Sequence, residues 1–203
     1  MEYIKHLSKD RIFRRVLAVQ EPVTLTRKRN VFLSLCSSIM SQQLSTRVAA
    51  VINNRFLSLY PGKKPSPEDI LNTDTETLRS IGLSNAKAAY VQHVARFALE
   101  QGLDNRTLNK LENEELIAYL TQIKGVGRWT VEMLMMFTLA REDVFAVGDL
   151  GIQIAMSELY GIDRGDKKKL QQEMLGLSER WSPYRTYACL HLWRWKDAKP
   201  IIN

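Results

Sequence analysis

Apolar residues recur three or four positions apart along most of the chain, and polar residues separate them. In residues 85–101 this spacing predicts a helix with one apolar face, formed by Ala88, Val91, Ala95 and Leu99. No segment of strand length alternates apolar and polar residues at every second position. The pattern therefore predicts an all-α fold.

Capping residues and glycines divide this pattern into about ten short helices with tight connections. Helices are expected to start after Asn30, Ser45, Ser66, Ser84, Asn113, Asp149, Asp166 and Ser182. They are expected to stop near Gly62, Gly82, Gly102, Gly161 and Gly176. We expect one functional unit over residues 1–203, built as a two-lobed helical globule with a cleft between the lobes. The predicted lobes are residues 31–115 and 116–203, with residues 1–30 packing on the C-terminal lobe.

Charge and composition narrow the function. The 203 residues include 29 Lys and Arg against 22 Asp and Glu, a net charge of +7. The excess lies at the two ends of the chain, and it is as compatible with simple solubility as with a polyanionic partner. The two cysteines exclude a four-cysteine metal or iron–sulfur centre. The sequence has neither a membrane-length apolar run nor a signal peptide, so a cytoplasmic protein is expected.

The segment TQIKGVGRWT at 121–130 carries the clearest chemical signal. An amphipathic helix ends there and a new one begins at once, with two glycines around a single apolar residue. Such a hairpin exposes backbone N–H groups at a helix N-terminus beside two cations, which suits a phosphate. The alternative is an ordinary turn between helices with glycine caps. The candidate phosphate-binding residues are Lys124, Gly125, Val126, Gly127, Arg128 and Thr130.

Residues 120–137 and 143–153 together resemble the helix–hairpin–helix motif and downstream aspartate of the helix–hairpin–helix (HhH-GPD) DNA glycosylase superfamily. Residues 38–50, 81–95 and 181–193 resemble further segments of that family in the right order. Among its branches, the 3-methyladenine DNA glycosylase II, or alkylation-repair, branch is the most similar. The resemblance implies base excision repair on double-stranded DNA containing a damaged base. A monomer is expected because one duplex needs one reader, and the protein is expected to be associated with the nucleoid when it is bound to DNA.

The resemblance makes Asp149 the catalytic residue, and a physical argument supports it. Cleavage of an N-glycosidic bond builds positive charge on the sugar. A carboxylate about 4 Å away, at an effective dielectric constant of about 20, stabilises that charge by roughly 4 kcal/mol, or about a thousandfold in rate. The same carboxylate can orient the attacking water. The alternative is that Asp149 only caps the helix that follows it.

The remaining site residues follow from the same resemblance. A loop at Gln42, Gln43 and Leu44 is expected to fill the gap left by the everted base, and Gln43 is the residue most expected to enter that gap. The alternative is that these residues are an ordinary polar helix end. The expected base pocket is formed by Trp129, Met133, Leu150, Trp193 and Tyr184, although Met133 and Trp193 also suit a hydrophobic core. The backbone carbonyls of Thr121, Ile123 and Val126 are expected to hold a structural Na⁺ or K⁺, and no catalytic cofactor is expected.

Trp129 stands where the family's bifunctional glycosylase/lyases carry a lysine, so a monofunctional enzyme without AP-lyase activity is expected. Glu132 is expected to face solvent. Without a general acid, alkylated purines such as 3-methyladenine and 7-methylguanine are the favoured substrates, because they are already cationic and stack on aromatic rings. The alternatives are a glycosylase for uracil or an oxidised base, a helix–hairpin–helix module that only binds DNA, and an unrelated helical interaction module.

Overall fold

The computed structural model describes residues 1–198, and its regular elements over that range are helices, as the sequence predicts. The chain divides into two compact units. The central unit is Arg27–Leu139, and the terminal unit combines Met1–Thr26 with Ala140–Asn203. Within the described residues, no helix is long and apolar enough to cross a membrane.

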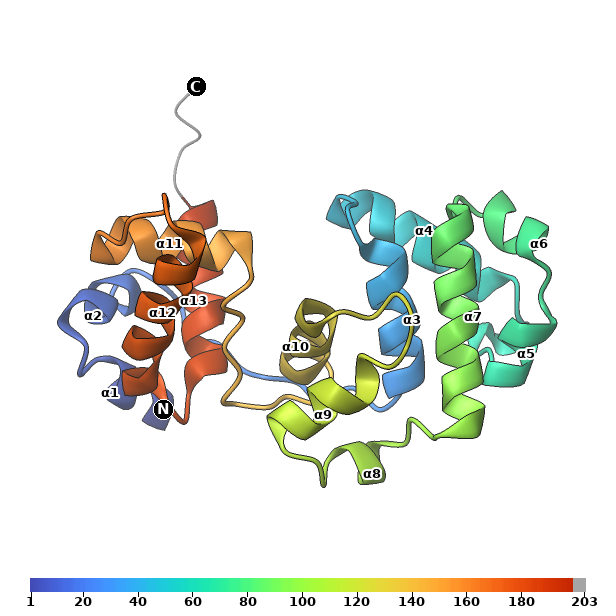
Figure 1. The fold of residues 1–203 in the computed structure, drawn as a ribbon, viewed down its shortest axis with the longest axis horizontal. Coiled ribbons are helices and arrows are strands. Elements are labelled where there is room, and N and C mark those ends of the chain that lie inside the picture. Colours follow the sequence, from blue (N-terminus) through green and yellow to red (C-terminus); the bar gives the residue numbers. More distant parts are fainter. Residues whose placement is uncertain (199–203) are drawn as a thin grey trace. The chain divides into compact units, whose positions relative to one another are not determined.

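In the central unit, helices α3 and α7 form the framework (Figure 1). α3 packs against α4, α7 and α10, and α7 also packs against α5 and α6. Leu35 and Ile39 of α3 and Val91 of α7 are fully buried between these helices. The elements of this unit are α3 (Val31–Ser41), α4 (Thr46–Ser58), η1 (Pro61–Lys63), α5 (Pro67–Asn72), α6 (Thr75–Ser80), α7 (Asn85–Glu100), α8 (Asn105–Leu108), α9 (Asn113–Leu120) and α10 (Arg128–Phe137).

The terminal unit joins both ends of the chain around Trp181, which is fully buried. The Trp181 ring lies against Phe13, with ring centroids 5.0 Å apart, and its indole N–H donates to Asp10 at 3.3 Å. The first residues therefore belong to the core of this unit. Its elements are α1 (Glu2–Leu7), α2 (Arg11–Leu17), α11 (Leu150–Tyr160), α12 (Lys167–Ser178), η2 (Glu179–Trp181) and α13 (Arg185–Asp197).

The boundary between the units differs from the one predicted after residue 115. Helices α9 and α10 belong to the central unit, because α10 packs on α3 and α9. Leu116 of α9 and Val131 of α10 are fully buried there. No linker composition marks the true boundary near residue 139, so only the packing of the apolar faces reveals it. The predicted cleft between the lobes stays a prediction.

Most predicted helix starts are confirmed by capping hydrogen bonds. The side chains of Asn30, Ser45, Ser84, Asp149 and Asp166 each accept a backbone N–H at the start of their helix, and Ser66 forms a capping box with Asp69.

Four local expectations are wrong. The N-cap of α9 is Glu112, which forms a capping box with Glu115, rather than Asn113. The last helix starts after Tyr184 rather than Ser182, and the Ser182 hydroxyl donates to Asp143 instead of capping that helix. Helix α12 continues through Gly176, where a Cβ would meet nothing within 4 Å. Leu99, expected on the buried face of α7, is 46% exposed near the end of that helix.

Candidate active site and nucleic-acid interface

The glycine hairpin between α9 and α10 uses its two glycines differently. Gly125 has φ +100°, and a Cβ there would lie 2.3 Å from the Tyr90 ring, so both backbone and packing require glycine. Gly127 has an extended conformation with φ −98°, and a Cβ would meet nothing within 4 Å. Neither the fold nor its neighbours therefore require glycine at 127. The residue leaves open space at the N-terminus of α10.

The two cationic side chains at this hairpin, Lys124 and Arg128, differ in their ion pairs. Lys124 is exposed, and its ammonium group has no ion pair within the part of the chain that the structure describes. Arg128 forms an ion pair with Glu114, and its Nε donates to Glu132 Oε1 at 3.0 Å. The hydrogen bonds that Arg128 donates to Glu114 raise the pKa of its guanidinium above the usual value. A phosphate would therefore meet a freely exposed Lys124 but would compete with two carboxylates for Arg128.

The expectation that Glu132 faces solvent is wrong. Its side chain is only 3% exposed, and it accepts from Arg128 one turn earlier on α10. The carboxylate packs inside the central unit because the arginine compensates its charge. Glu132 therefore holds the Arg128 side chain against α10.

The predicted gap-filling loop follows α3 directly, since that helix ends at Ser41. Gln43 has φ +59°, a strained conformation for a residue with a side chain, and it is exposed. Holding a residue other than glycine in this region costs about 1–2 kcal/mol, and such strain concentrates at functional positions. Leu44 is also exposed, at 36%. The tip of the loop is therefore Gln43 and Leu44.

Gln42 takes a different direction from its two neighbours. Its side-chain amide donates to the carbonyl of Gly125 at 3.4 Å and to the Thr130 hydroxyl at 3.3 Å. Gln42 therefore joins the loop to the hairpin within the central unit.

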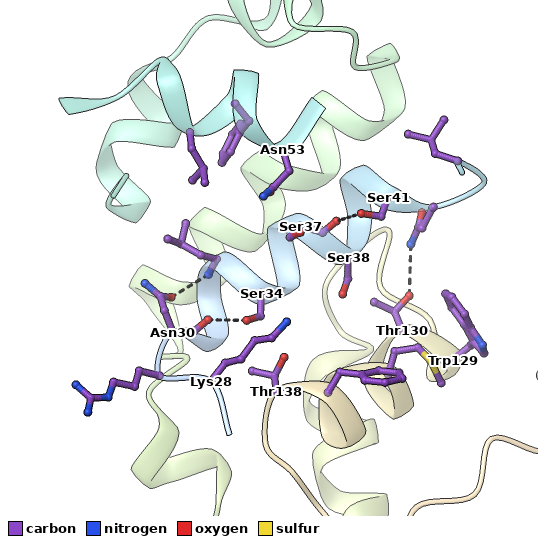
Figure 2. Close-up of a pocket in the computed structure, with 18 of the residues that line it drawn as sticks. Lys28, Asn30, Ser34, Ser37, Ser38, Ser41, Asn53, Trp129, Thr130 and Thr138 are labelled. Carbon is purple, nitrogen blue, oxygen red and sulfur yellow. Dashed lines mark hydrogen bonds between the residues drawn. The ribbon is translucent and has the colours of Figure 1, made fainter. Parts of the chain in front are cut away.

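A cavity of about 700 Å³ opens across α3, between α4 and α10 (Figure 2). It brings together several predicted residues: Trp129, Thr130 and Met133 from α10, and Gln42, Gln43 and Leu44 from the loop. Trp129 is 44% exposed, which suits a stacking surface better than a core position. The other predicted base-pocket residues, Leu150, Trp193 and Tyr184, belong to the terminal unit and do not line this cavity.

The residues that form one wall of this cavity were not predicted from the sequence. Four serines of α3, at positions 34, 37, 38 and 41, line it, and in Figure 2 Ser38 points toward the side on which Thr130 lies. Their spacing of three and four residues places small polar side chains along one helix, and that spacing was the signal available in the sequence. Lys28, Arg29 and Lys63 also line the cavity.

In the terminal unit, Asp149 is the N-cap of α11 and is partly exposed. Its Oδ1 accepts the backbone N–H of Ile152 at 3.0 Å and the indole N–H of Trp193 at 2.8 Å. Trp193 therefore presents its N–H edge to the carboxylate. A Cβ at residue 151 would lie 3.0 Å from the Trp193 ring and 3.1 Å from Asp149 Oδ1, so Gly151 allows this close approach. Next to the carboxylate, Leu150 is 61% exposed.

The segment leading to Asp149 is fastened to the start of α13. Arg185 donates to both carboxylate oxygens of Asp143, at 2.6 and 2.8 Å. Burial opposes ionisation of Asp143, but the hydrogen bonds from Arg185 and Ser182 outweigh it and hold its pKa below the usual value. Thr186, fully buried, donates to the carbonyl of Arg141 at 2.6 Å and accepts from the backbone N–H of Val144 at 3.0 Å. These contacts, which the sequence does not predict, fix the path of residues 141–144, five residues before Asp149.

Tyr184 makes its contacts away from Asp149, and its predicted role in the base pocket stays a prediction. Tyr184 directly precedes α13 and lies nine residues before Trp193, which separates them by about 13 Å along the helix axis. Its ring packs edge-on against His6, and its hydroxyl donates to Glu2. It lines a separate cavity of about 340 Å³ with Tyr3 and Tyr187.

The fold and these two sites define a helical protein with a glycine hairpin open at a helix N-terminus and a fixed, partly exposed aspartate downstream of it. Residues 36–180 match the family model described as HhH-GPD superfamily base excision DNA repair protein. The chain belongs to this family.

Several relatives are similar over most of the chain. DNA-3-methyladenine glycosylase 1 of Schizosaccharomyces pombe is 38% identical over 169 residues, which cover 82% of this chain and 73% of that protein. The structure of Schizosaccharomyces pombe 3-methyladenine DNA glycosylase (Mag1) in complex with abasic DNA has a TM-score of 0.83, with 33% identity and 96% of each chain covered. DNA-3-methyladenine glycosidase from Bacillus halodurans has a TM-score of 0.85, with 38% identity and 98% and 90% coverage.

Proposed function

We propose that this chain is a monofunctional DNA glycosylase that hydrolyses the N-glycosidic bond of alkylated purines after the damaged nucleotide is flipped out of the duplex. The single observation that carries the proposal is the carboxylate of Asp149, which two N–H donors fix while it stays partly exposed. The names of the relatives, which are 3-methyladenine glycosylases, support the substrate class.

The role of Asp149 in this reaction is electrostatic. As the bond to the base breaks, the sugar acquires positive charge, and a carboxylate nearby stabilises it. The donors from Ile152 and Trp193 both bind Oδ1, which holds the side chain in one rotamer. The carboxylate also orients the water that attacks the sugar carbon and accepts its proton. No residue needs to protonate a cationic alkylated base, since it leaves as a neutral molecule.

The DNA is held through its backbone at the hairpin. The open space at Gly127 and the N-terminus of α10 suit a phosphate oxygen, with Lys124 beside it. Trp129 occupies the position where a lysine would form a Schiff base with the sugar, so we expect base release without strand cleavage. A monomer suffices for this reaction, because one duplex presents one damaged base at a time.

The hairpin carbonyls are compatible with a structural Na⁺ or K⁺. Side chains already donate to the carbonyls of Lys124 and Gly125, from His93 and Gln42. Among the described residues no hydrogen bond reaches the carbonyls of Thr121 and Val126, and that of Ile123 accepts one from the Val126 N–H. Those three carbonyls are the expected ligands. The ion would add positive charge where the phosphate binds, and it takes no part in the chemistry.

The Asp149→Asn substitution tests the proposal. Asparagine keeps the Oδ1 acceptor, so the helix cap and the bond from Trp193 remain while the negative charge is lost. We expect base release from a duplex containing 7-methylguanine to fall by about a thousandfold, with nearly unchanged affinity for DNA and unchanged thermal stability. Base release at the wild-type rate would refute the catalytic role of Asp149, whereas no base release by the native protein would leave only a DNA-binding module.

The substrate class needs a separate measurement. Purified protein is incubated with duplexes containing 3-methyladenine, 7-methylguanine, uracil or 8-oxoguanine, and the released base is quantified. Alkaline treatment of half of each sample distinguishes abasic sites from strand cleavage by the protein itself. Release of alkylated purines without intrinsic cleavage is expected. Activity confined to uracil or 8-oxoguanine would overturn the substrate class, and intrinsic cleavage would overturn the monofunctional mechanism.

A further inference from the structure

The C-terminal end of α3 is held by a lysine from another helix. Lys87, in the first turn of α7, donates from Nζ to the carbonyl of Met40 at 2.9 Å and to that of Gln42 at 2.6 Å. The last carbonyls of a helix have no partners within the helix, and a cation at this end also interacts favourably with the helix dipole. Because α3 and α7 pack tightly, the ammonium group comes from a rigid element.

Gln42 is thus fixed twice. The ammonium group of Lys87 donates to the backbone carbonyl of Gln42. The side-chain amide of Gln42 donates to Gly125 and Thr130 at the hairpin. The strained Gln43 follows immediately, with φ +59°. A strained backbone conformation persists only where the surrounding structure fixes it. The residue before Gln43 is fixed in this way, and Lys87 is one of its partners.

We propose that Lys87 is a positioning residue, which holds the loop Gln42–Leu44 in the conformation that directs Gln43 into the gap left by the everted base. This inference rests on the proposed function, because it concerns the base-flipping step of the same reaction. Lys87 acts through the loop, since its ammonium group is bound to two carbonyls of the protein. Its loss therefore impairs eversion of the base while it leaves the phosphate contacts at the hairpin intact.

The test measures eversion separately from bond cleavage. All variants carry Asp149→Asn, and the duplex carries 2-aminopurine, whose fluorescence rises when it is unstacked, in place of the damaged base. We expect Lys87→Met to reduce the eversion equilibrium by about tenfold. Lys110→Met is the matched control, because Lys110 is exposed and its ammonium group makes no hydrogen bond or ion pair among the described residues. That control should leave eversion unchanged.

A double-mutant cycle distinguishes positioning from a general structural defect. If Lys87 acts through the loop tip, Lys87→Met changes eversion by less than about twofold once Gln43→Ala is present. Equal losses in both backgrounds, or no loss in either, would overturn the proposal. Should Lys87→Met fail to fold in a thermal melt, Gln42→Met tests the same idea, because it removes the side-chain bonds to the hairpin and leaves α7 untouched.

Failure of this inference can be told apart from failure of the proposed function. Protein with native Asp149 is assayed in parallel for release of 7-methylguanine. The native protein can excise the base while the Lys87→Met variant shows the same eversion and the same excision. In that case only the positioning role of Lys87 is wrong. If the native protein releases no damaged base from any duplex, the proposed function is wrong, and with it this inference.

Discussion

The two glycines of the hairpin give a sharp test of how its structure relates to DNA binding. Alanine at 125 would place a Cβ 2.3 Å from the Tyr90 ring in a backbone with φ +100°. The backbone strain costs about 1–2 kcal/mol, and the displacement of Tyr90 costs about 1–3 kcal/mol more. The expected loss of stability for Gly125→Ala is therefore about 2–5 kcal/mol, which corresponds to a decrease in Tm of about 10 °C for a chain of this size.

Alanine at 127 should behave in the opposite way. The extended backbone accepts alanine, and its Cβ meets no protein atom within 4 Å, so stability should change by less than about 1 kcal/mol. The added methyl group would instead occupy the space proposed for a phosphate oxygen. Loss of one hydrogen bond to a charged group costs about 1.5–3 kcal/mol, which weakens binding by about 10- to 100-fold.

Thermal denaturation and fluorescence anisotropy with an undamaged duplex measure the two effects. Gly125→Ala should lose stability, and Gly127→Ala should lose affinity while its melting curve matches that of the native protein. Equal destabilisation by both substitutions would refute the interpretation that only Gly125 is required by the fold. Native affinity in Gly127→Ala would refute the placement of the phosphate at this helix terminus.

Three further outcomes are expected. Lys124→Ala should weaken binding to all DNA sequences alike and reduce the slope of log K against log [salt] by about 1; unchanged affinity in a salt titration would show that Lys124 makes no phosphate contact. Arg185→Met should cost about 1–3 kcal/mol in urea unfolding, because Asp143 is left without its charged donor, and it should slow base release while DNA affinity is retained. Burial, and to a lesser degree Arg194, lowers the pKa of His191 to about 4. Below pH 6.5 the unfolded chain therefore binds more protons at His191 than the folded chain does. As the pH falls from 6.5 to 4, the free energy of unfolding should decrease by about 3 kcal/mol. An equal decrease in the His191→Gln variant, measured by urea unfolding, would assign the pH dependence to other groups.

The sequence by itself determined the helical class, most helix starts and the hairpin. These features depend on local chemistry: apolar spacing, side chains that cap the next turn, and a glycine pair around one apolar residue. Local pattern alone predicts Asp149 as a helix cap, and only the resemblance to the family marks it as the catalytic candidate. The structure shows that it caps α11 while it stays partly exposed. Its catalytic role stays a prediction.

Only the tertiary structure decided which side chains work together. Gln42 and Gln43 are neighbours of the same type, yet one contacts the hairpin and the other is exposed with a strained backbone. Trp193 of α13 donates its indole N–H to Asp149, whereas Tyr184, just before the same helix, packs against His6. Lys87 lies about 45 residues from the carbonyls that it holds. Such contacts join residues far apart in the chain, and their geometry depends on how helices pack, which local spacing does not encode.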